Sequence, residues 1–437
     1  MKKQLMASIK APNYTLLKNG VHVVTESLPG IRSASVGLYL DTGSRDEQPQ
    51  HNGLAHLYEH MVFKGTATYN PLQIVQRFEA AGGQVNAYTS KEQTCLHAKV
   101  VDSEVEGSLA MLLEMALASQ FDEAELKKEK EVIVEEIHSV HDNPEEQVYE
   151  LFTHAMFGKH SLGRPIAGTD QSVRGISRDT LLAHQTKAHE TLPFLISAVG
   201  SIDHKRMIKI TEAAFAKSAK TKAISTKAAV KRKPLKRDCP KPTAKHLIET
   251  RKVQQASLIL GGPGYGWDNP KRLALLLMNT VLGDGMSSRL FQSVREDKGL
   301  VYSIYSSPEF LMGTGMFTIG LATEPKDIPA ALKAISTEIR RLKREGLSQQ
   351  DLDGAKANLR GSVLLSLEST NTRMGNLARQ YLNGKGFESV DSVLKRVEKV
   401  NRRDITGVIA DVFDKKKWAS AVVGPMKKLE MAKLLDF

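Results

Sequence analysis

The chain of 437 residues is too long for one ordinary hydrophobic core and suits two domains of about 200 residues each. Its composition, with 41% hydrophobic and 25% charged residues, is typical of globular proteins, and no run of about 18 apolar residues predicts a membrane span. The two cysteines, Cys95 and Cys239, exclude a disulfide framework, and the formal net charge of +12 raises the question of a nucleic-acid partner.

The N-terminal residues do not form a secretory signal. Residues 1–6 (MKKQLM) are positively charged, but no apolar stretch precedes Lys10 and Pro12. The first acidic residue is Glu26, which leaves a short transit peptide open, although Arg is absent there. We therefore expect a cytoplasmic location, with the mitochondrial matrix as the alternative in a eukaryote.

Strand and helix patterns alternate through the first half. Strands are expected at residues 21–25, 33–40, 84–89 and 94–100. Helices are expected from about Leu54, from Pro71 with Asn70 as the N-cap to Gly82, and over 103–118, and a further long helix is expected with Asp122 as its cap. In the last of these helices the expected buried stripe is Leu126, Ile133, Ile137 and Val140.

Residues 56–60, with the sequence His-Leu-Tyr-Glu-His, form an H-x-x-E-H motif inside the helix expected from Leu54. On a helix His56 and His60 share one face, so their imidazoles can bind one ion with Glu59 beside them. Two imidazoles leave a tetrahedral zinc ion short of one protein ligand and a water. The motif therefore indicates a zinc hydrolase of the inverzincin type and predicts a distant partner residue. The alternative, in a chain with 13 histidines, is a chance motif on an exposed helix.

The helix that starts at Asp122 carries the candidate third ligand. Four glutamates lie on it, at positions 129, 131, 135 and 136. Glu129 and Glu136 are seven residues apart and lie on nearly the same face, so one can ligate while the other supports it. The alternative is that these acids form only the solvated side of the helix. The need of the motif for a carboxylate favours a ligand, because this half holds no other equally compact acidic cluster.

The positive charge is concentrated in one segment. Between Lys217 and Lys245 there are eleven Lys or Arg residues and one acid, Asp238, so this segment carries most of the net charge. It also contains Ala, Thr and Pro without a hydrophobic period, which is typical of a solvated linker. We therefore predict an interdomain linker at residues 217–246, with a patch for an acidic partner as the alternative.

The chain repeats itself after about 225 residues. Residues 122–130 match 348–356 at an offset of 226, 178–179 match 403–404 at 225, and 198–200 lie against 422–424 at 224. Three landmarks that agree within two residues indicate an internal duplication. We therefore predict two homologous α+β domains, each a sheet packed with helices, at residues 1–216 and 247–437.

The candidate site residues are not repeated with the framework. The offset of 226 carries His56, Glu59, His60 and Glu136 to Leu282, Gly285, Met286 and Ser362, in that order. The second copy is therefore expected to lack a metal site.

Several further stretches accompany the motif: residues 53–66 (GLAHLYEHMVFKGT), 86–89 (NAYT), 135–136 (EE), 162–165 (LGRP), 288–292 (SRLFQ) and 295–302 (REDKGLVY). Together they resemble the insulinase or pitrilysin family of zinc metallopeptidases, in the two-domain branch that contains mitochondrial processing peptidase and its bacterial relatives. The resemblance covers nearly the whole chain. Tyr58 departs from the family, which more often has an aliphatic residue there, and this concerns packing rather than chemistry.

The resemblance implies a complete metal site. In the family the third zinc ligand is a Glu some 76 residues after the second His, which is Glu136 in this sequence. It implies one Zn²⁺ per chain, held by His56, His60 and Glu136, with Glu129 orienting a ligand from outside. Glu59 would act as general base on the zinc-bound water and pass the proton to the departing amine. The chain is thus expected to be a zinc metalloendopeptidase.

The resemblance also implies how a peptide or presequence-like segment is held in an enclosed cleft. Strand 84–89 lies near the site in such a fold, where the backbone of Asn86 and Ala87 would hold an extended peptide by β-addition. Arg295 and Tyr302 look like the Arg and Tyr pair of the family, which contacts substrate and would donate to a carbonyl oxygen or oxyanion. Without the family, Arg295 in its charged run would be interpreted as an ordinary surface residue.

The assembly state follows from the same resemblance. Relatives of this length supply two of the four homologous domains that enclose a cleft, and two-chain members divide the zinc motif and the Arg and Tyr pair between their chains. This chain carries both, so we expect a C₂ homodimer with Arg295 and Tyr302 acting in trans.

Two other classes of function stay open. A non-catalytic structural relative of processing peptidase is disfavoured because all four zinc-site residues are present. A basic binding module for nucleic acid or an acidic partner is disfavoured because the charge lies in a linker. We expect no nucleic-acid partner and no membrane span.

Overall fold

The computed structural model of the chain describes residues 11–190, 194–217, 235–383 and 386–437. Its internal contacts divide the chain into two compact units, each with one sheet. The first unit comprises residues 1–137, 165–236 and 365–389, and the second comprises 138–164, 237–364 and 390–437. No helix in these described ranges is both long and apolar enough to cross a membrane. Most of the predicted linker, residues 218–234, lies outside the described residues.

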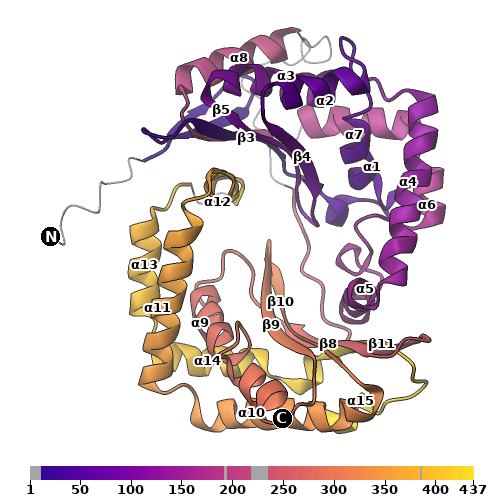
Figure 1. Cartoon of the computed structure of the whole chain (residues 1–437), viewed down its shortest axis with the longest axis vertical. Helices are drawn as coiled ribbons and strands as arrows, with labels where there is room; N and C mark the ends of the chain where they lie inside the picture. The colour runs from indigo at the N-terminus through magenta and orange to yellow at the C-terminus, as the bar shows by residue number, and fades with distance from the viewer. Residues whose placement is uncertain (1–10, 191–193, 218–234, 384–385) are drawn as a thin grey trace, which may run out of the picture. The chain divides into compact units, whose positions relative to one another are not determined.

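The sheet of the first unit has six strands in the order β1-β2-β6-β3-β5-β4, of which Figure 1 labels β3, β4 and β5. The strands are β1 Asn13–Leu16, β2 Val21–Ser27, β3 Ser33–Leu40, β4 Gln84–Thr89, β5 Thr94–Val101 and β6 Phe194–Gly200. All neighbours are antiparallel except β2 and β6, which are parallel. The four strands predicted in this half are therefore present, and β4 lies at an edge of the sheet.

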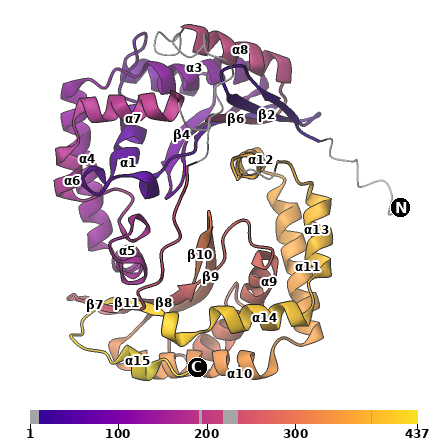
Figure 2. The same ribbon diagram turned by 180° about the vertical axis from the view of Figure 1, so that it is seen from behind.

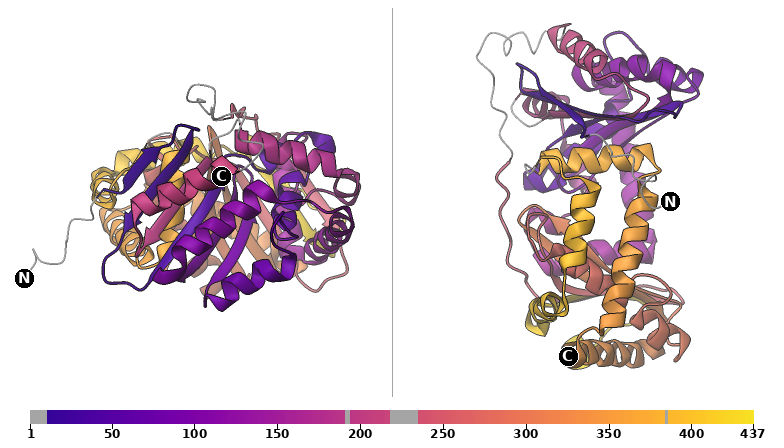
Figure 3. Two further views of the ribbon diagram at one scale, coloured as in Figure 1. Left: turned by 90° about the horizontal axis from the view of Figure 1, so that it is seen from above. Right: turned by 90° about the vertical axis from the view of Figure 1, so that its left-hand side faces the viewer.

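Helices cover both faces of this sheet. On one face α3 (Val105–Ala118) and α8 (His204–Lys217) lie side by side (Figure 3). On the other face α12 (Thr370–Leu382) packs against β3 and β6. Along β3, Leu38 joins the core beneath α3, and the next residue, Tyr39, contacts the cluster that includes Met374 of α12. β3 is therefore buried on both faces from Ala34 to Leu40.

The first unit contains further helices, of which α1 carries the motif. They are α1 Leu54–Met61, α2 Pro71–Ala80, α6 Asp170–Gly175, α7 Arg178–Glu190 and most of α4 Glu123–Asp142. The predicted caps are confirmed: Asn70 accepts a hydrogen bond from the Gln73 amide, and Asp122 accepts one from the Ala124 amide. The helix predicted over 103–118 begins later, at Val105, after a 3₁₀ turn.

The buried stripe predicted along α4 is shorter than expected. Leu126 and Ile133 are buried, whereas Ile137 and Val140 are half-buried. The reason is that α4 leaves the first unit at Ile137. Val134 is also buried in α4, although it was not part of the predicted stripe.

The sheet of the second unit has five strands in the order β7-β11-β8-β10-β9 (Figure 2). The strands are β7 His246–Thr250, β8 Ala256–Pro263, β9 Ser303–Leu311, β10 Thr314–Thr323 and β11 Ala419–Gly424. The helices are α5 Pro144–Phe157, α9 Arg272–Leu282, α10 Ile328–Glu345, most of α11 Gln349–Ser366, α13 Val390–Lys399, α14 Arg402–Val412 and α15 Met431–Leu434. α9, α10 and α14 pack on one face of the sheet and α5 on the other.

The two halves of the chain exchange one helix. α5 follows α4 in the first half but packs on β8 and β11 of the second unit. α12 follows α11 in the second half but packs on β3 and β6 of the first unit. Each sheet thus has its second apolar face covered by a helix from the other half, and the compact units do not coincide with a division of the chain at the linker.

The duplication predicted from the sequence is confirmed. The strand order β2-β6-β3-β5-β4 recurs as β7-β11-β8-β10-β9, with the parallel pair in the same place. α4 and α11 begin at Glu123 and Gln349, which are 226 residues apart, as predicted. Near the motif the offset is smaller. α9, the helix of the second half that is compared with α1, begins at Arg272 and ends at Leu282, before Gly285 and Met286. α9 itself contains no His, Asp or Glu, so its sequence offers no counterpart of the motif.

Candidate metal centre

The start of the motif helix α1 is fixed by Glu47. One oxygen of the Glu47 carboxylate accepts a hydrogen bond from the Gly53 amide at 2.9 Å, and the other accepts one from the Ala55 amide at 2.7 Å. Gly53 has a φ of 94°, and a Cβ atom there would lie 2.5 Å from the carbonyl oxygen of Ala167. Only glycine fits this close approach, so the loop and the 165–168 turn together set the direction of α1. The side-chain amide of Asn52 links the same two segments, because it donates to the Glu47 carboxylate and to the carbonyl of Pro165.

The inner face of α1 is anchored in the core by Leu57 and Tyr58, both fully buried. The hydroxyl of Tyr58 lies 3.3 Å from Nε2 of His189, and its ring makes edge contacts with Phe121 and His184. The buried hydroxyl therefore has a polar partner, which a buried tyrosine requires. This explains how the chain accommodates the residue at which it departs from the family pattern.

The outer face of α1 brings the two histidines of the motif to Glu136 of α4. The carboxylate Oε2 of Glu136 lies 3.8 Å from Nε2 of His56 and 3.6 Å from Nε2 of His60. In the described part of the chain, this is the one cluster of three His, Cys, Asp or Glu side chains whose donor atoms all lie within 4.8 Å of one another. Ligands of a tetrahedral zinc ion are about 3.3 Å apart, so modest movement would complete the site.

The two histidines are mostly buried, whereas the carboxylate is open to solvent. The side chains of His56 and His60 are 18% exposed and that of Glu136 is 47% exposed. Burial, with the neighbouring His60, lowers the pKa of His56 to about 4. A neutral imidazole is the form that ligates a metal, so two imidazoles and one carboxylate fit zinc, and the Glu136 side chain of the cluster is open to solvent.

Glu129 lies outside this cluster and contacts one of its histidines, His60. Its Oε2 lies 3.1 Å from Nδ1 of His60, the ring nitrogen opposite the one that faces Glu136. Its Oε1 lies 2.6 Å from Nζ of Lys64. Of the two glutamates predicted to share a face of α4, Glu136 therefore joins the imidazoles directly and Glu129 contacts one of them from outside.

Glu59 lies beside the cluster and contacts β4. Its Oε2 accepts a hydrogen bond of 2.5 Å from the hydroxyl of Thr89, the last residue of β4. Burial raises the pKa of Glu59, an effect opposed by the Thr89 hydrogen bond and by His60 and increased by Glu136. A carboxylate with a raised pKa close to a metal cluster suits proton transfer near neutral pH.

The other residues predicted to contact substrate lie on different elements. Asn86 and Ala87 are in the edge strand β4, which pairs with β5 along one side. Arg295 and Tyr302 belong to the second unit. Arg295 lies over the ring of Phe291 at 4.5 Å, and Tyr302 is 71% exposed.

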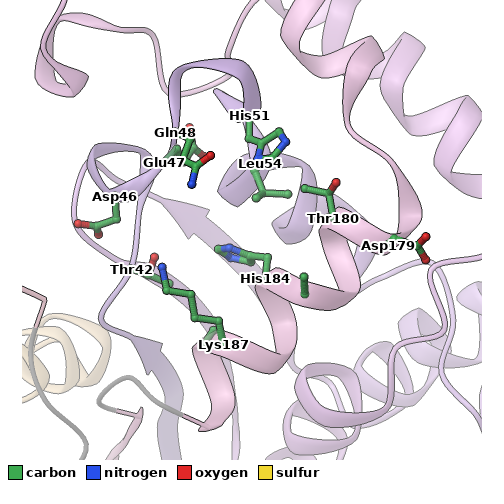
Figure 4. A pocket seen from close by; sticks show the side chains of 12 residues that line it. Thr42, Asp46, Glu47, Gln48, His51, Leu54, Asp179, Thr180, His184 and Lys187 are labelled. Carbon is green, nitrogen blue, oxygen red and sulfur yellow. The ribbon is translucent and has the colours of Figure 1, made fainter.

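A cavity of about 440 Å³ lies between the loop before α1 and the helix α7 (Figure 4). Asp46 and Glu47 line it from the loop, and His184 and Lys187 line it from α7. Burial and the nearby Lys187 lower the pKa of His184 to about 4. The cavity includes none of the metal-cluster residues, so it adjoins the beginning of α1 and is separate from the candidate metal centre.

Comparison with known proteins agrees with this arrangement. Residues 22–170 match the sequence pattern described as "Insulinase (Peptidase family M16)", and residues 175–359 match the one described as "Peptidase M16 inactive domain". A protein of Bacillus subtilis named as an uncharacterized zinc protease is 38% identical over 410 residues, which are 93% of this chain and 97% of that protein. The chain belongs to the insulinase family of peptidases. A second relative, named as an uncharacterized zinc protease of Streptomyces coelicolor, is 35% identical over 422 residues, 97% of this chain and 91% of its own.

Solved structures show the same insulinase-family fold at lower identity. A protease from Helicobacter pylori has a TM-score of 0.85 and 20% identity, with 95% of this chain and 99% of that chain covered. A structure from Pseudomonas fluorescens titled peptidase M16 inactive domain has a TM-score of 0.84 and 22% identity, with 96% and 99% covered. Membership of the family and the names of the relatives support a peptidase role and zinc as the metal.

Three side chains of this insulinase-family site were not predicted to act there. They are Glu47, which caps the motif helix, Lys64, which contacts Glu129, and Thr89, which contacts Glu59. Lys64 lies four residues after His60, a spacing that could have suggested a side chain near the cluster. Glu47 reaches α1 only through the tertiary structure, so no sequence signal pointed to it. Thr89 ends the strand that the resemblance placed near the site, but its contact with Glu59 depends on the tertiary structure.

Proposed function

We propose that this insulinase-family chain is a zinc-dependent endopeptidase that cleaves peptides or presequence-like segments. The observation that carries the proposal is the convergence of His56, His60 and Glu136 on one point with Glu59 beside them. Zinc hydrolases use such a set: two imidazoles and one carboxylate as metal ligands, and a second carboxylate nearby that does not bind the metal, here Glu59.

Zinc held by His56, His60 and Glu136 would supply Lewis acidity for attack on a peptide carbonyl. Glu59 would accept a proton from the attacking water and deliver it to the departing amine. The hydrogen bond from Thr89 holds one oxygen of Glu59, which leaves its other oxygen for the proton. Glu129 would orient the ring of His60 from outside the cluster.

The edge strand β4 is the proposed place for an extended peptide. β4 has a sheet neighbour, β5, on one side only, and the Ala87 amide donates to the side chain of the adjacent Asn86 at 2.8 Å, a local bond that a peptide carbonyl could replace. The corresponding edge strand of the second unit, β9, is less suited, because the Ser306 amide already donates to Gly283 and Pro308 has no amide hydrogen. This difference favours addition of substrate at Asn86 and Ala87.

The proposal is tested by digestion of a peptide library with the full-length protein. Zinc-loaded protein should cleave, treatment with a chelator should remove nearly all cleavage, and stoichiometric zinc should restore it. The reason is that the proposed residues lack a nucleophile of their own and depend on the metal. Cleavage that survives removal of all measurable zinc would contradict the proposal.

We further propose a C₂ homodimer in which Arg295 and Tyr302 of one chain serve the zinc site of the other. The proposal rests on the presence of both the zinc motif and the Arg and Tyr pair in one insulinase-family chain. The exposed ring of Tyr302 suits a residue that contacts substrate.

Complementation tests this arrangement. Glu59→Gln protein and an Arg295→Ala, Tyr302→Phe double variant should each be nearly inactive alone. After subunit exchange, a mixed dimer contains one intact zinc site opposite one intact pair, so activity should return in part. No recovery despite proven exchange would contradict action in trans, and a fully active monomer would contradict the dimer.

A further inference from the structure

Lys64 lies where the motif helix ends. The amide of Lys64 donates to the carbonyl of Met61, and Gly65, with a φ of 112°, turns the chain away directly afterward. The side chain of Lys64 thus leaves the turn that directly follows α1, about one turn beyond His60, and is 29% exposed. Its position is fixed by the same short segment that carries the candidate metal ligands.

The partner of Lys64 is a buried carboxylate. The side chain of Glu129 is 8% exposed, and its two oxygens have different partners. Oε1 lies 2.6 Å from the Lys64 ammonium and Oε2 lies 3.1 Å from Nδ1 of His60. A buried carboxylate is costly without a counter-charge, so Lys64 stabilises Glu129 in this place, and its contact with one oxygen leaves the other oxygen to face His60.

The contact with Glu129 selects one form of the His60 ring. A carboxylate only accepts hydrogen bonds, so Nδ1 of His60 carries the hydrogen and Nε2 presents its lone pair. Nε2 is the atom that faces Glu136. His56 is different, because its Nδ1 is buried without a hydrogen-bond partner in the described part of the chain.

We propose that Lys64 is a positioning residue for the metal centre: through Glu129 it holds the His60 ring in the orientation and tautomer that bind a divalent cation. The proposal rests on the proposed zinc site and adds a residue to it. His60 is thereby the pre-oriented imidazole of the pair, whereas Nδ1 of His56 has no comparable partner in the described part of the chain. Lys64 touches neither metal nor substrate and acts only through the carboxylate.

The test is the zinc dissociation constant of the full-length protein, measured by competition with a chromophoric chelator. Lys64→Met keeps the length of the side chain but removes its charge, and should weaken zinc binding about 10- to 100-fold. Lys64→Arg keeps a cation and should retain most of the wild-type zinc affinity. A loss of affinity that came only from lower protein stability would not depend on the charge at position 64 in this way. Zinc affinity of Lys64→Met equal to that of the wild type would overturn the proposal.

A matched control is available on the neighbouring helix. Lys128 makes an ion pair with Glu125 at the same distance, 2.6 Å, but its side chain is 68% exposed. Lys128→Met should leave the zinc dissociation constant unchanged. A loss as large as that of Lys64→Met would show a non-specific effect of charge and would also overturn the proposal.

The route through Glu129 is tested by combining substitutions. In a Glu129→Gln background, Lys64→Met should change the zinc affinity by less than about twofold, because residues that act as a unit do not add. Additive losses would overturn the route. This background also removes the buried negative charge, so the comparison remains possible if Lys64→Met alone folds poorly. A wild-type protein that binds no zinc would defeat the proposed function, whereas tight binding by both wild type and Lys64→Met would defeat this inference alone.

Discussion

Glu59→Gln is expected to lower kcat/KM for peptide hydrolysis about 10²- to 10⁴-fold while the protein still binds zinc. The amide cannot accept the proton of the attacking water, but its oxygen can accept the same hydrogen bond from Thr89, so the side chain should keep its place. Glu59 is also outside the three-residue metal cluster, which explains why the metal should stay. The measurement is steady-state hydrolysis of a fluorogenic peptide, together with the zinc content of the same sample.

The size of this effect distinguishes a general base from a residue that only shapes the site. Glu135→Gln provides the control, because it makes the same chemical change on α4 outside the metal cluster, and it should leave turnover unaltered. Turnover at the wild-type rate by Glu59→Gln would show that the assigned mechanism is wrong.

Glu136→Ala should abolish hydrolysis, and Glu135→Ala should not. The two glutamates are adjacent on α4, but only the Glu136 carboxylate approaches Nε2 of both His56 and His60. Loss of a residue that merely supports a ligand costs about 10- to 100-fold in affinity or activity, and loss of a ligand should cost at least the upper end of that range. The comparison is made by peptide hydrolysis at a fixed low concentration of free zinc.

Equal activity of the two alanine variants would contradict the choice of Glu136. If Glu129→Ala instead showed the larger loss, the roles assigned to the two glutamates on that face of α4 would be reversed.

The motif helix and its neighbours could be predicted from the sequence because their signals are local. The spacing of His56 and His60, the Asn70 cap with Pro71, and the apolar strands each depend on residues close together in the chain. The repeat also predicted the second sheet, since α4 and α11 keep the offset of 226. These features stay the same in any packing that the chain adopts.

The features that the sequence could not predict depend on residues distant in the chain. α5 and α12 have ordinary amphipathic sequences, and only the packing shows that each covers a sheet in the other half. Along α4, spacing placed Glu129 and Glu136 on one face but left their roles open. In the tertiary structure the two glutamates have different contacts. Glu136 approaches Nε2 of both His56 and His60, whereas Glu129 approaches only Nδ1 of His60.

The most direct measurement of the central claim is the zinc content of three purified proteins after equilibration at the same free zinc concentration: wild type, Glu135→Ala and Glu136→Ala. The convergence of His56, His60 and Glu136 predicts one zinc per chain in the first two and substantially less in the third. One zinc per chain in Glu136→Ala, or none in the wild type, would contradict the assignment of this metal centre.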